Sequence, residues 1–507
     1  MNRSAPRPAP ITVLDLFAGC GGLTEGFHQF RPSRGEDRPV FRTVGAVEWD
    51  AAAAASYEMN FGARSPRLPA GVTPAKVYCE DIVDWIPSGL GEIDVVVGGP
   101  PCQGFSGLNR DKVKAERNQL WQEFIRVVEH VQPRVFVIEN VDRFVRSPEF
   151  ADLQDRVRSG ALKNYVLVDP PGTGDESKPS RARGYLLNSA DYGSPQARRR
   201  AIVIGVRTNA GLDPSRFAYP APTHARATAS GNGDVQQSLD GRPRLIPWAS
   251  VDAVFERSAR NPLTAVNLPD RRPVVGKVVG TYRTTDLHIT RSPEPISLAR
   301  YRAIPPKGNR KDLRGTYLLT TASGATALLR KVLEFRDGQG NLAVEGDYEV
   351  LDGEGAGTTL SVKLSGEPGP RDVARSGRHR SETFVVRVDR GGTETDGRLE
   401  YLSTASWDSH DAGSGDVMGR LRLGEPSVTV RTEFFKPEKG RYLHPTEDRP
   451  ITHFEAAKLQ GFPDDFLWCG SKTEIARQIG NAVPIPLGRS IARSIYDFLR
   501  VSTVQGR

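Results

Sequence analysis

The sequence predicts an α/β fold with a doubly wound, mostly parallel sheet and a smaller, β-rich domain. Three observations support this prediction. Short apolar runs alternate with amphipathic segments from about residue 11 to residue 207, this alternation stops near residue 208, and helical spacing returns from residue 452. Strands that alternate with helices are typical of a parallel sheet covered on both faces.

The apolar runs at residues 12–17, 43–48, 93–98, 135–139 and 201–206 are typical of buried strands. Helical spacing occupies residues 23–30, 51–60 and 120–131, and later 474–479 and about 486–499. The chain therefore divides into a first domain at residues 1–207, a middle domain at 208–440, and a C-terminal return at 441–507 that completes the first domain.

The middle domain is rich in Arg, Gly, Pro and Asp and lacks long helical periods. Within it, residues 316–402 carry turn signals at 337–338, 352–353 and 390–392, which separate apolar runs such as 383–388. We expect a β-rich insertion there.

Composition excludes some classes of protein. The chain has 507 residues and a formal net charge of +8, which is compatible with a nucleic-acid partner without requiring one. Its four cysteines are Cys20, Cys79, Cys102 and Cys469, and none forms a C-x-x-C pair, so we expect free thiols in a reducing cytoplasm and no metal site. Neither a signal peptide nor a membrane span is predicted.

The first strand leads into DLFAGCGGL at residues 15–23, a glycine turn that opens a helix. Such turns bring backbone amides close to an anionic ligand. The spacing is not that of a dinucleotide fold, and it suits a smaller group such as the carboxylate of a methionine moiety. The alternative is a tight turn without a ligand. The candidate contacts are Phe17, Gly19, Gly21, Gly22 and Leu23.

Acidic residues follow the next strands. Glu48 can accept hydrogen bonds from ribose hydroxyls, and Trp49 offers a flat face to adenine. Asp81, beside Ile82, can accept a hydrogen bond from the adenine amino group. Singly, these residues could be solvated acids and a packing Trp. In this order, on successive strand ends, they indicate S-adenosylmethionine, with S-adenosylhomocysteine as the product.

The run GGPPCQGFS at residues 98–106 follows a buried strand. Its Gly-Gly-Pro-Pro turn is rigid and presents Cys102 at the carboxyl end of the sheet, where ligands bind in such folds, with Pro100 near the cofactor. The alternative is a buried, inert thiol.

Together these motifs, in their linear order, resemble the DNA (cytosine-5)-methyltransferase family, and a bacterial modification enzyme in particular. The resemblance covers residues 15–206 and 449–484. It implies methyl transfer from S-adenosylmethionine to carbon 5 of a flipped-out cytosine in a specific duplex sequence. Carbon 5 is a poor nucleophile, and attack of the Cys102 thiolate on carbon 6 activates it.

The resemblance also assigns roles to charged residues. Glu139, in IENV at 138–141, holds the ring at nitrogen 3 as a carboxylic acid in the reacting state. In QARRR at 196–200, Arg198 and Arg200 share one face of a strand and are directed at the base carbonyl and the catalytic loop. Arg199, on the other face, contacts phosphate or is solvated.

Double-stranded DNA is the partner that the resemblance implies. A basic loop at residues 104–120 would close over it, and the middle domain would read the target sequence. The expected DNA contacts are Gln103, Ser106, Arg110, Arg199, Arg431 and Lys436. The insertion, whose basic loop holds Arg371, Arg375, Arg378 and Arg380, either extends the DNA contact or is a surface elaboration or docking module.

Two late motifs complete the pattern. RPIT at 449–452 and EAAKLQGFP at 455–463 would buttress the recognition region, with Thr452 as a helix N-cap. QIGNAVP at 478–484 would close the cofactor pocket through Asn481 and Val483, or form a cap without a ligand.

Two other functions are weighed against this one. A transfer-RNA methyltransferase on the same scaffold is disfavoured by the long middle domain. A catalytically silent DNA-binding homologue is disfavoured because Cys102 and Glu139 are both present. We expect a cytoplasmic, nucleoid-associated protein that acts as a monomer on DNA, with a role in restriction-modification or phage defence.

Overall fold

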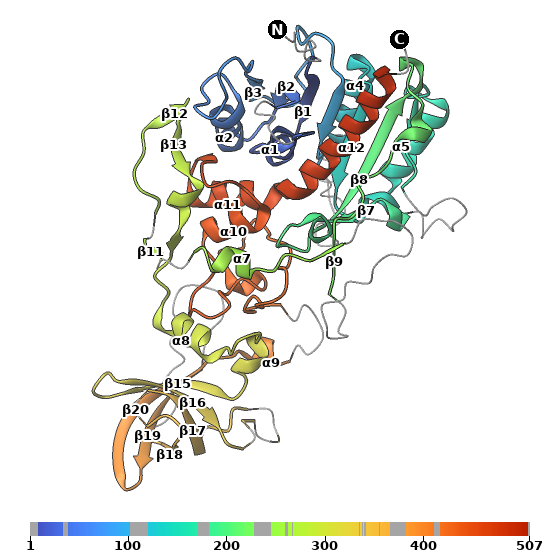
Figure 1. The fold of residues 1–507 in the computed structure, drawn as a ribbon. Coiled ribbons are helices and arrows are strands. Elements are labelled where there is room, and N and C mark those ends of the chain that lie inside the picture. The colour runs from blue at the N-terminus through green and yellow to red at the C-terminus, as the bar shows by residue number, and fades with distance from the viewer. Residues whose placement is uncertain are drawn as a thin grey trace.

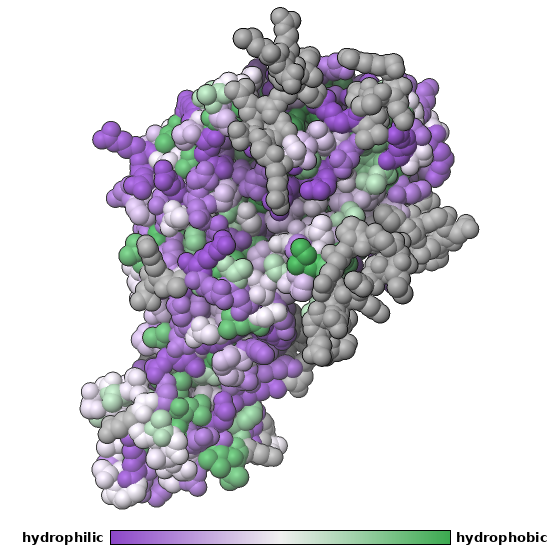
Figure 2. All heavy atoms as spheres, viewed as in Figure 1, coloured by the Kyte–Doolittle hydropathy of each residue, from purple (hydrophilic) through white to green (hydrophobic). Residues whose placement is uncertain are grey.

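The computed structural model describes residues 9–33, 39–101, 120–170, 182–227, 245–258, 262–265, 267–333, 335–336, 338, 341–353, 355–365, 382–409 and 416–504. A large body contains the main sheet, and a separate β-barrel forms the opposite end of the molecule (Figure 1). In the space-filling view the barrel is the narrower lobe at the bottom (Figure 2). No helix in the described ranges is long and apolar enough to span a membrane.

The main sheet has eight strands, in the order β3-β2-β1-β4-β5-β8-β6, and β7 also pairs with β8. Its parallel strands are β1 (Ile11–Leu16), β2 (Phe41–Val47), β3 (Lys76–Tyr78), β4 (Val95–Gly98) and β5 (Val135–Asn140). The mostly parallel sheet predicted from the sequence is therefore confirmed.

The far side of the sheet is antiparallel, which the alternation of strands and helices did not reveal. Strand β8 (Arg199–Arg207) runs antiparallel to β5, and β6 (Tyr165–Leu167) and β7 (Leu186–Asn188) pair antiparallel with β8. Only residues 189–198 connect β7 to β8, which is too short for the crossover that parallel neighbours need. The reversal brings the first residues of β8 beside the end of β5.

Helices cover the sheet. They are α1 (Gly22–Gln29), α2 (Ala51–Phe61), α4 (Leu120–Val131) and α5 (Pro148–Ser159), followed near the C-terminus by α10 (His453–Gln460), α11 (Lys472–Asn481) and α12 (Ile485–Val504). Helix α12 packs against α1 (Figure 1) and adds Leu487, Ile491 and Ile495 to the core of the first domain. Thr452 caps α10 in a reciprocal pair with Glu455, as expected.

The middle of the chain is largely irregular. It contains β9 (His224–Ala225), β10 (Ile246–Pro247), α7 (Asp252–Phe255), β11 (Leu263–Thr264), β12 (Pro273–Val275), β13 (Val278–Arg283), β14 (Ile289–Thr290), α8 (Pro295–Ala303) and α9 (Ala405–Asp408). Strand β13 pairs with β21 (Leu467–Cys469), which joins the middle of the chain to its C-terminal return. The sequence analysis did not anticipate α8.

The β-rich insertion forms a closed barrel of β15 (Thr316–Thr321), β16 (Thr326–Lys331), β17 (Gly346–Asp352), β18 (Thr359–Leu364), β19 (Thr383–Arg390) and β20 (Thr393–Tyr401). The expected turns at 352–353 and 390–392 join β17 to β18 and β19 to β20, whereas Asp337 lies outside the described residues. In β19, Val386 and Val388 are buried and Val385 is exposed, which is the alternation of a strand with one face on a core.

We expect the body to fold without the barrel. The two ends of the barrel meet, because the Leu402 amide donates to the Thr316 carbonyl at 3.0 Å. A short glycine linker in place of residues 317–401 should therefore leave a single cooperative thermal transition. Its midpoint should fall by a few degrees, since Leu318 and Leu328 also pack into the small core that contains Trp407. Loss of that transition in differential scanning calorimetry would show that the body depends on the barrel.

Candidate active site

The glycine turn after β1 leaves open space at the carboxyl edge of the sheet. Phe17, Gly19 and Gly21 have φ angles of 54°, 57° and 91°, in the left-handed region. A Cβ atom placed on Gly19 would meet nothing within 4 Å, whereas one on Gly22 would lie 3.0 Å from the carbonyl oxygen of Val483. The turn is thus open on one side and closed by the late motif on the other.

Glu48 ties the end of β2 to this turn. Its Oε2 accepts a hydrogen bond from the Gly19 amide, and its Oε1 accepts one from the Asp50 amide, both at 2.8 Å. Burial raises the pKa of Glu48 from its ordinary value, and these backbone bonds oppose the shift. Trp49, the next residue, keeps 75% of its surface exposed. A buried carboxylate and an exposed indole therefore lie beside the open turn.

The other predicted cofactor contacts follow β3 or lie in or next to the helices beside the glycine turn. The Glu48 amide donates to the Tyr78 carbonyl at 3.0 Å, which joins β2 to the end of β3. A few residues farther on, Asp81 is exposed and accepts a hydrogen bond from the Val83 amide at 3.0 Å, while Ile82 is buried. Leu23 and Val483 are also buried, and Asn481 is exposed.

The segment after β4 lies against the end of β5. The Asn140 side chain donates to the Pro100 carbonyl at 2.9 Å, and a Cβ atom on Gly99 would be 2.9 Å from Oε2 of Glu139. On the other side, Arg200 Nε lies 2.9 Å from Glu139 Oε1. That ion pair lacks hydrogen-bond geometry, so Glu139 Oε1 is a buried acceptor without a donor among the described residues.

Arg198 is buried behind this pair. It donates from Nη1 to the Val430 carbonyl at 3.0 Å, and its Nε has no hydrogen-bond acceptor in the described part of the chain. Burial, and secondarily the charge of Arg200, lower the pKa of Arg198 to about 9. Arg199 is exposed on the opposite face. The predicted alternation of these arginines is what the structure shows.

The remaining predicted residues are divided. Cys102, Gln103, Ser106 and Arg110 lie outside the described residues, as does the insertion loop with Arg371, Arg375, Arg378 and Arg380. Arg431 is exposed and forms no ion pair within the described ranges. Lys436 pairs with Glu433 and lies 5.4 Å from the ring centroid of Phe435, so its charge is already partly compensated.

Two buried glutamines, which the sequence analysis did not single out, connect the arginine strand to the late motifs. Gln196 accepts a hydrogen bond from the Val430 amide and donates to Oε1 of Gln460, both at 2.8 Å. Gln460 in turn donates to the Ile479 carbonyl at 2.6 Å. The segment around Val430 is therefore joined to the motif beside the glycine turn through two side chains.

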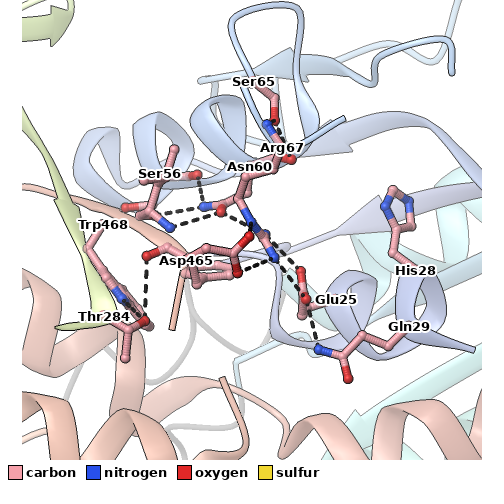
Figure 3. Close-up of polar contacts among 12 residues, drawn as sticks. Glu25, His28, Gln29, Ser56, Asn60, Ser65, Arg67, Thr284, Asp465 and Trp468 are labelled. Carbon is pink, nitrogen blue, oxygen red and sulfur yellow. Dashed lines mark hydrogen bonds and ion pairs between the residues drawn. The ribbon is translucent and has the colours of Figure 1, made fainter. Parts of the chain in front are cut away.

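A second network holds the helices around that turn (Figure 3). Arg67 donates to Glu25 of α1 at 3.0 Å, to Asn60 of α2 at 2.9 Å and to Asp465 after α10 at 3.2 Å. The Glu25 carboxylate is almost fully buried, which makes this a tie between α1 and two distant segments. No local sequence signal marks Arg67, because each of its partners lies on a different element.

Comparison with known proteins identifies the family. A family described as C-5 cytosine-specific DNA methylase matches residues 11–261 and 374–497. The chain belongs to this family. It is 30% identical over 498 residues to the Type II methyltransferase M.AgeI of Thalassovita gelatinovora, a match that covers 96% of this chain and 99% of that relative.

Two further comparisons agree. Identity to the Type II methyltransferase M.XorII of Xanthomonas oryzae is 27%, covering 97% of this chain and 85% of that one. The crystal structure of a DNA modification methyltransferase encoded within an E. coli prophage superposes with a TM-score of 0.52 at 19% identity, covering 97% and 99% of the two chains, which shows a shared fold. The predicted family, fold class and enzyme class are confirmed, while the roles of individual site residues stay predictions.

Asp15 of β1 gives this methyltransferase a testable dependence of stability on pH. Its carboxylate is buried and accepts a hydrogen bond from Thr24 at 2.6 Å. Burial raises the pKa of Asp15 from 3.8 to about 7. Between these two values the Asp15 carboxyl ionises in the unfolded chain but stays protonated in the folded one, so a rise in pH favours unfolding. The free energy of unfolding of Asp15→Asn, relative to wild type, should therefore rise from about pH 4 to pH 7 in urea denaturation. A difference independent of pH would contradict this.

The contribution of the pair Gln196 and Gln460 to stability can be measured by substitution. Gln460→Leu removes the acceptor of Gln196 and the donor of the Ile479 carbonyl, all buried. Leaving such groups without partners costs about 1–3 kcal/mol of unfolding free energy. Chemical denaturation should show a loss in this range, and the exposed Gln122→Leu on α4 should show almost none. Equal effects of the two substitutions would refute the role of the pair.

Proposed function

We propose that this methyltransferase transfers a methyl group from S-adenosylmethionine to carbon 5 of a flipped-out cytosine in a specific duplex DNA sequence, through a covalent adduct of Cys102 with carbon 6. The observation that carries the proposal is the meeting of three strand ends. Glu139 lies between Arg200 and the segment that ends at Pro101, the residue before Cys102 in the sequence.

The cofactor half of the site fits S-adenosylmethionine. The open space at Gly19 suits the methionine carboxylate, which backbone amides can approach there. Glu48 would accept hydrogen bonds from the ribose hydroxyls with its remaining lone pairs, and the exposed Trp49 would contact adenine. Asp81, Ile82, Pro100, Asn481 and Val483 complete the proposed contacts. When bound, the cofactor supplies an electrophilic methyl group on a sulfonium.

The base half of the site would activate cytosine. Glu139 would bind ring nitrogen 3 as a carboxylic acid, and the charges of Arg198 and Arg200 would favour both the thiolate and the negative charge that develops on the ring. The Cys102 sulfur bonds to carbon 6, and carbon 5 takes the methyl group. Loss of the carbon 5 proton then expels the thiolate and restores the ring. Within the described ranges Glu139 Oε1 has no hydrogen-bond donor besides its ion pair with Arg200, and Arg198 Nε has no acceptor, which supports a site built for a polar ligand.

DNA would lie between the body and the middle domain, where Arg199 and Arg431 offer exposed guanidinium groups. The insertion at 316–402 holds 11 Lys and Arg residues against 14 Asp and Glu residues, so its net charge does not favour DNA. A docking or elaborating role suits that charge better. The two Type II relatives support a role in restriction-modification, with action on DNA in the bacterial cytoplasm.

Covalent trapping tests the mechanism. On duplex DNA with 5-fluorocytosine at the target, the wild-type protein should form an adduct that survives denaturing electrophoresis, because fluorine cannot leave as the proton does. Cys102→Ala should form none. Cys79→Ala, which removes an exposed thiol elsewhere, should still form it. Glu139→Gln should lower kcat by about 10²–10⁴-fold, the range expected for loss of an acid catalyst.

The target sequence and the nucleic acid are tested separately. Bisulfite sequencing of DNA from expressing cells should show methylated cytosine within one short sequence. Methylation of transfer RNA with unmodified DNA would instead support the alternative substrate. An adduct that persists in Cys102→Ala, or no adduct with wild type, would refute the proposed chemistry.

A further inference from the structure

A cavity of about 370 Å³ lies next to the arginine strand, outside the two halves of the site described above. Ala197 forms one part of its wall, and other parts come from residues 425–429, Arg431 and residues 440–442. These segments are joined directly, because the Ala197 amide donates to the Ser427 carbonyl at 2.8 Å. The cavity is therefore adjacent to Arg198, and its volume lies within the range of about 300–1,000 Å³ that is typical of ligand sites.

The charges that line the cavity are not balanced. Asp416 is paired with Arg441 at 3.0 Å, and Glu425 is paired with Arg422 at 3.6 Å. The two remaining charged groups in the wall are the guanidinium groups of Arg226 and Arg431, which form no ion pair with any carboxylate in the described ranges. With every lining carboxylate matched, two positive charges remain, and the cavity favours an anion.

One of these two guanidinium groups is held in place. Arg226 Cζ lies 5.3 Å from the ring centroid of Trp248, a cation–π contact. Trp248 is itself fixed at both ends. Its indole Nε1 donates a hydrogen bond to Asp191 at 2.9 Å, and its backbone amide donates one to the Ala225 carbonyl at 2.9 Å. Trp248 thus orients a cation that donates no side-chain hydrogen bond to the described residues, as in a preformed anion site.

We propose that this cavity binds one backbone phosphate of the substrate DNA near the target cytosine, between Arg226 and Arg431, with Trp248 as the residue that positions Arg226. The inference rests on the proposed function, since that function brings DNA to Arg198. A phosphodiester carries one negative charge and accepts several hydrogen bonds, which matches two guanidinium groups that line the same cavity. Such a contact fixes the register of the protein on the duplex without reading a base.

A double-mutant cycle between protein and DNA tests the proposal. Duplexes carry one neutral methylphosphonate at each position around the target in turn, and binding is measured by fluorescence anisotropy. At one position the neutral linkage should weaken wild-type binding about tenfold, the effect of losing a charged hydrogen bond. Arg226→Gln and Arg431→Gln should weaken binding to unmodified DNA similarly, with little further loss when variant and neutral linkage are combined.

Matched variants separate this contact from a general loss of charge. Arg158→Gln removes the same charge from an exposed position on α5, where Arg158 is paired with Asp155, and its effect should add to that of every neutral linkage. Trp248→Leu should weaken the coupling to the neutral linkage as Arg226→Gln does, because it removes the aromatic ring that positions Arg226. Trp248→Phe, which keeps an aromatic ring, should retain most of the coupling. The slope of log affinity against log salt should fall by about one for Arg226→Gln.

Additive effects of both arginine variants at every scanned phosphate would overturn the proposal. So would binding of inorganic phosphate that depends on Arg226 and Arg431 without coupling to any DNA phosphate, because the site would then serve a free anion. These measurements need no methyl transfer. A protein that traps 5-fluorocytosine but shows no coupling would refute only the cavity assignment, whereas failure to trap would refute the proposed chemistry.

Discussion

Asn140, the last residue of β5, is opposite Ala201 in β8, so the start of one strand lies beside the end of the other. This antiparallel register sets Arg200 against Glu139 and leaves Arg198 buried behind them. The residues just before β8 then pair with the segment around Ser427, which brings the middle domain to the same edge. The contact of Glu139 with Arg200 and the approach of the segment around Ser427 both depend on where this single reversed strand begins.

The site has buried polar atoms that form no hydrogen bond with the described part of the protein. Glu139 Oε1, although ion-paired with Arg200, and Arg198 Nε lack hydrogen-bond partners among the described residues, whereas about nine in ten buried polar groups in folded proteins have one. Elsewhere the same region is well bonded, as the Gln196–Gln460 pair and the Arg67 network show. These two atoms lie where a nucleobase would bring its own donors and acceptors. Rigid surroundings hold them there at a cost to stability.

Local patterns were sufficient to predict most of the first domain. Apolar runs marked the strands, and the glycine turn, Glu48 and Glu139 stand at strand ends that sequence order identifies. Contacts between distant segments could not be predicted, because one chain carries no signal that joins Gln196 to Gln460 or Arg67 to Glu25. The reversal of β8 belongs to the same class, since strand direction is set by the length and path of connections. Arg226 and Trp248 directly follow the two-residue strands β9 and β10 in an irregular region, where periodicity gives no information.

The closed barrel affects the folding of the whole chain in a way that its size does not suggest. Because Thr316 and Leu402 are hydrogen-bonded neighbours, the barrel presents its ends to the body as a short loop would once it has folded. The entropy lost in closing that long stretch of sequence is then offset within the barrel itself, by its own core. Helix α8 precedes the barrel and α9 follows it. Once the barrel has folded, the two helices are connected as if only a few residues separated them in the chain. The insertion therefore adds little effective contact order to the segments that flank it.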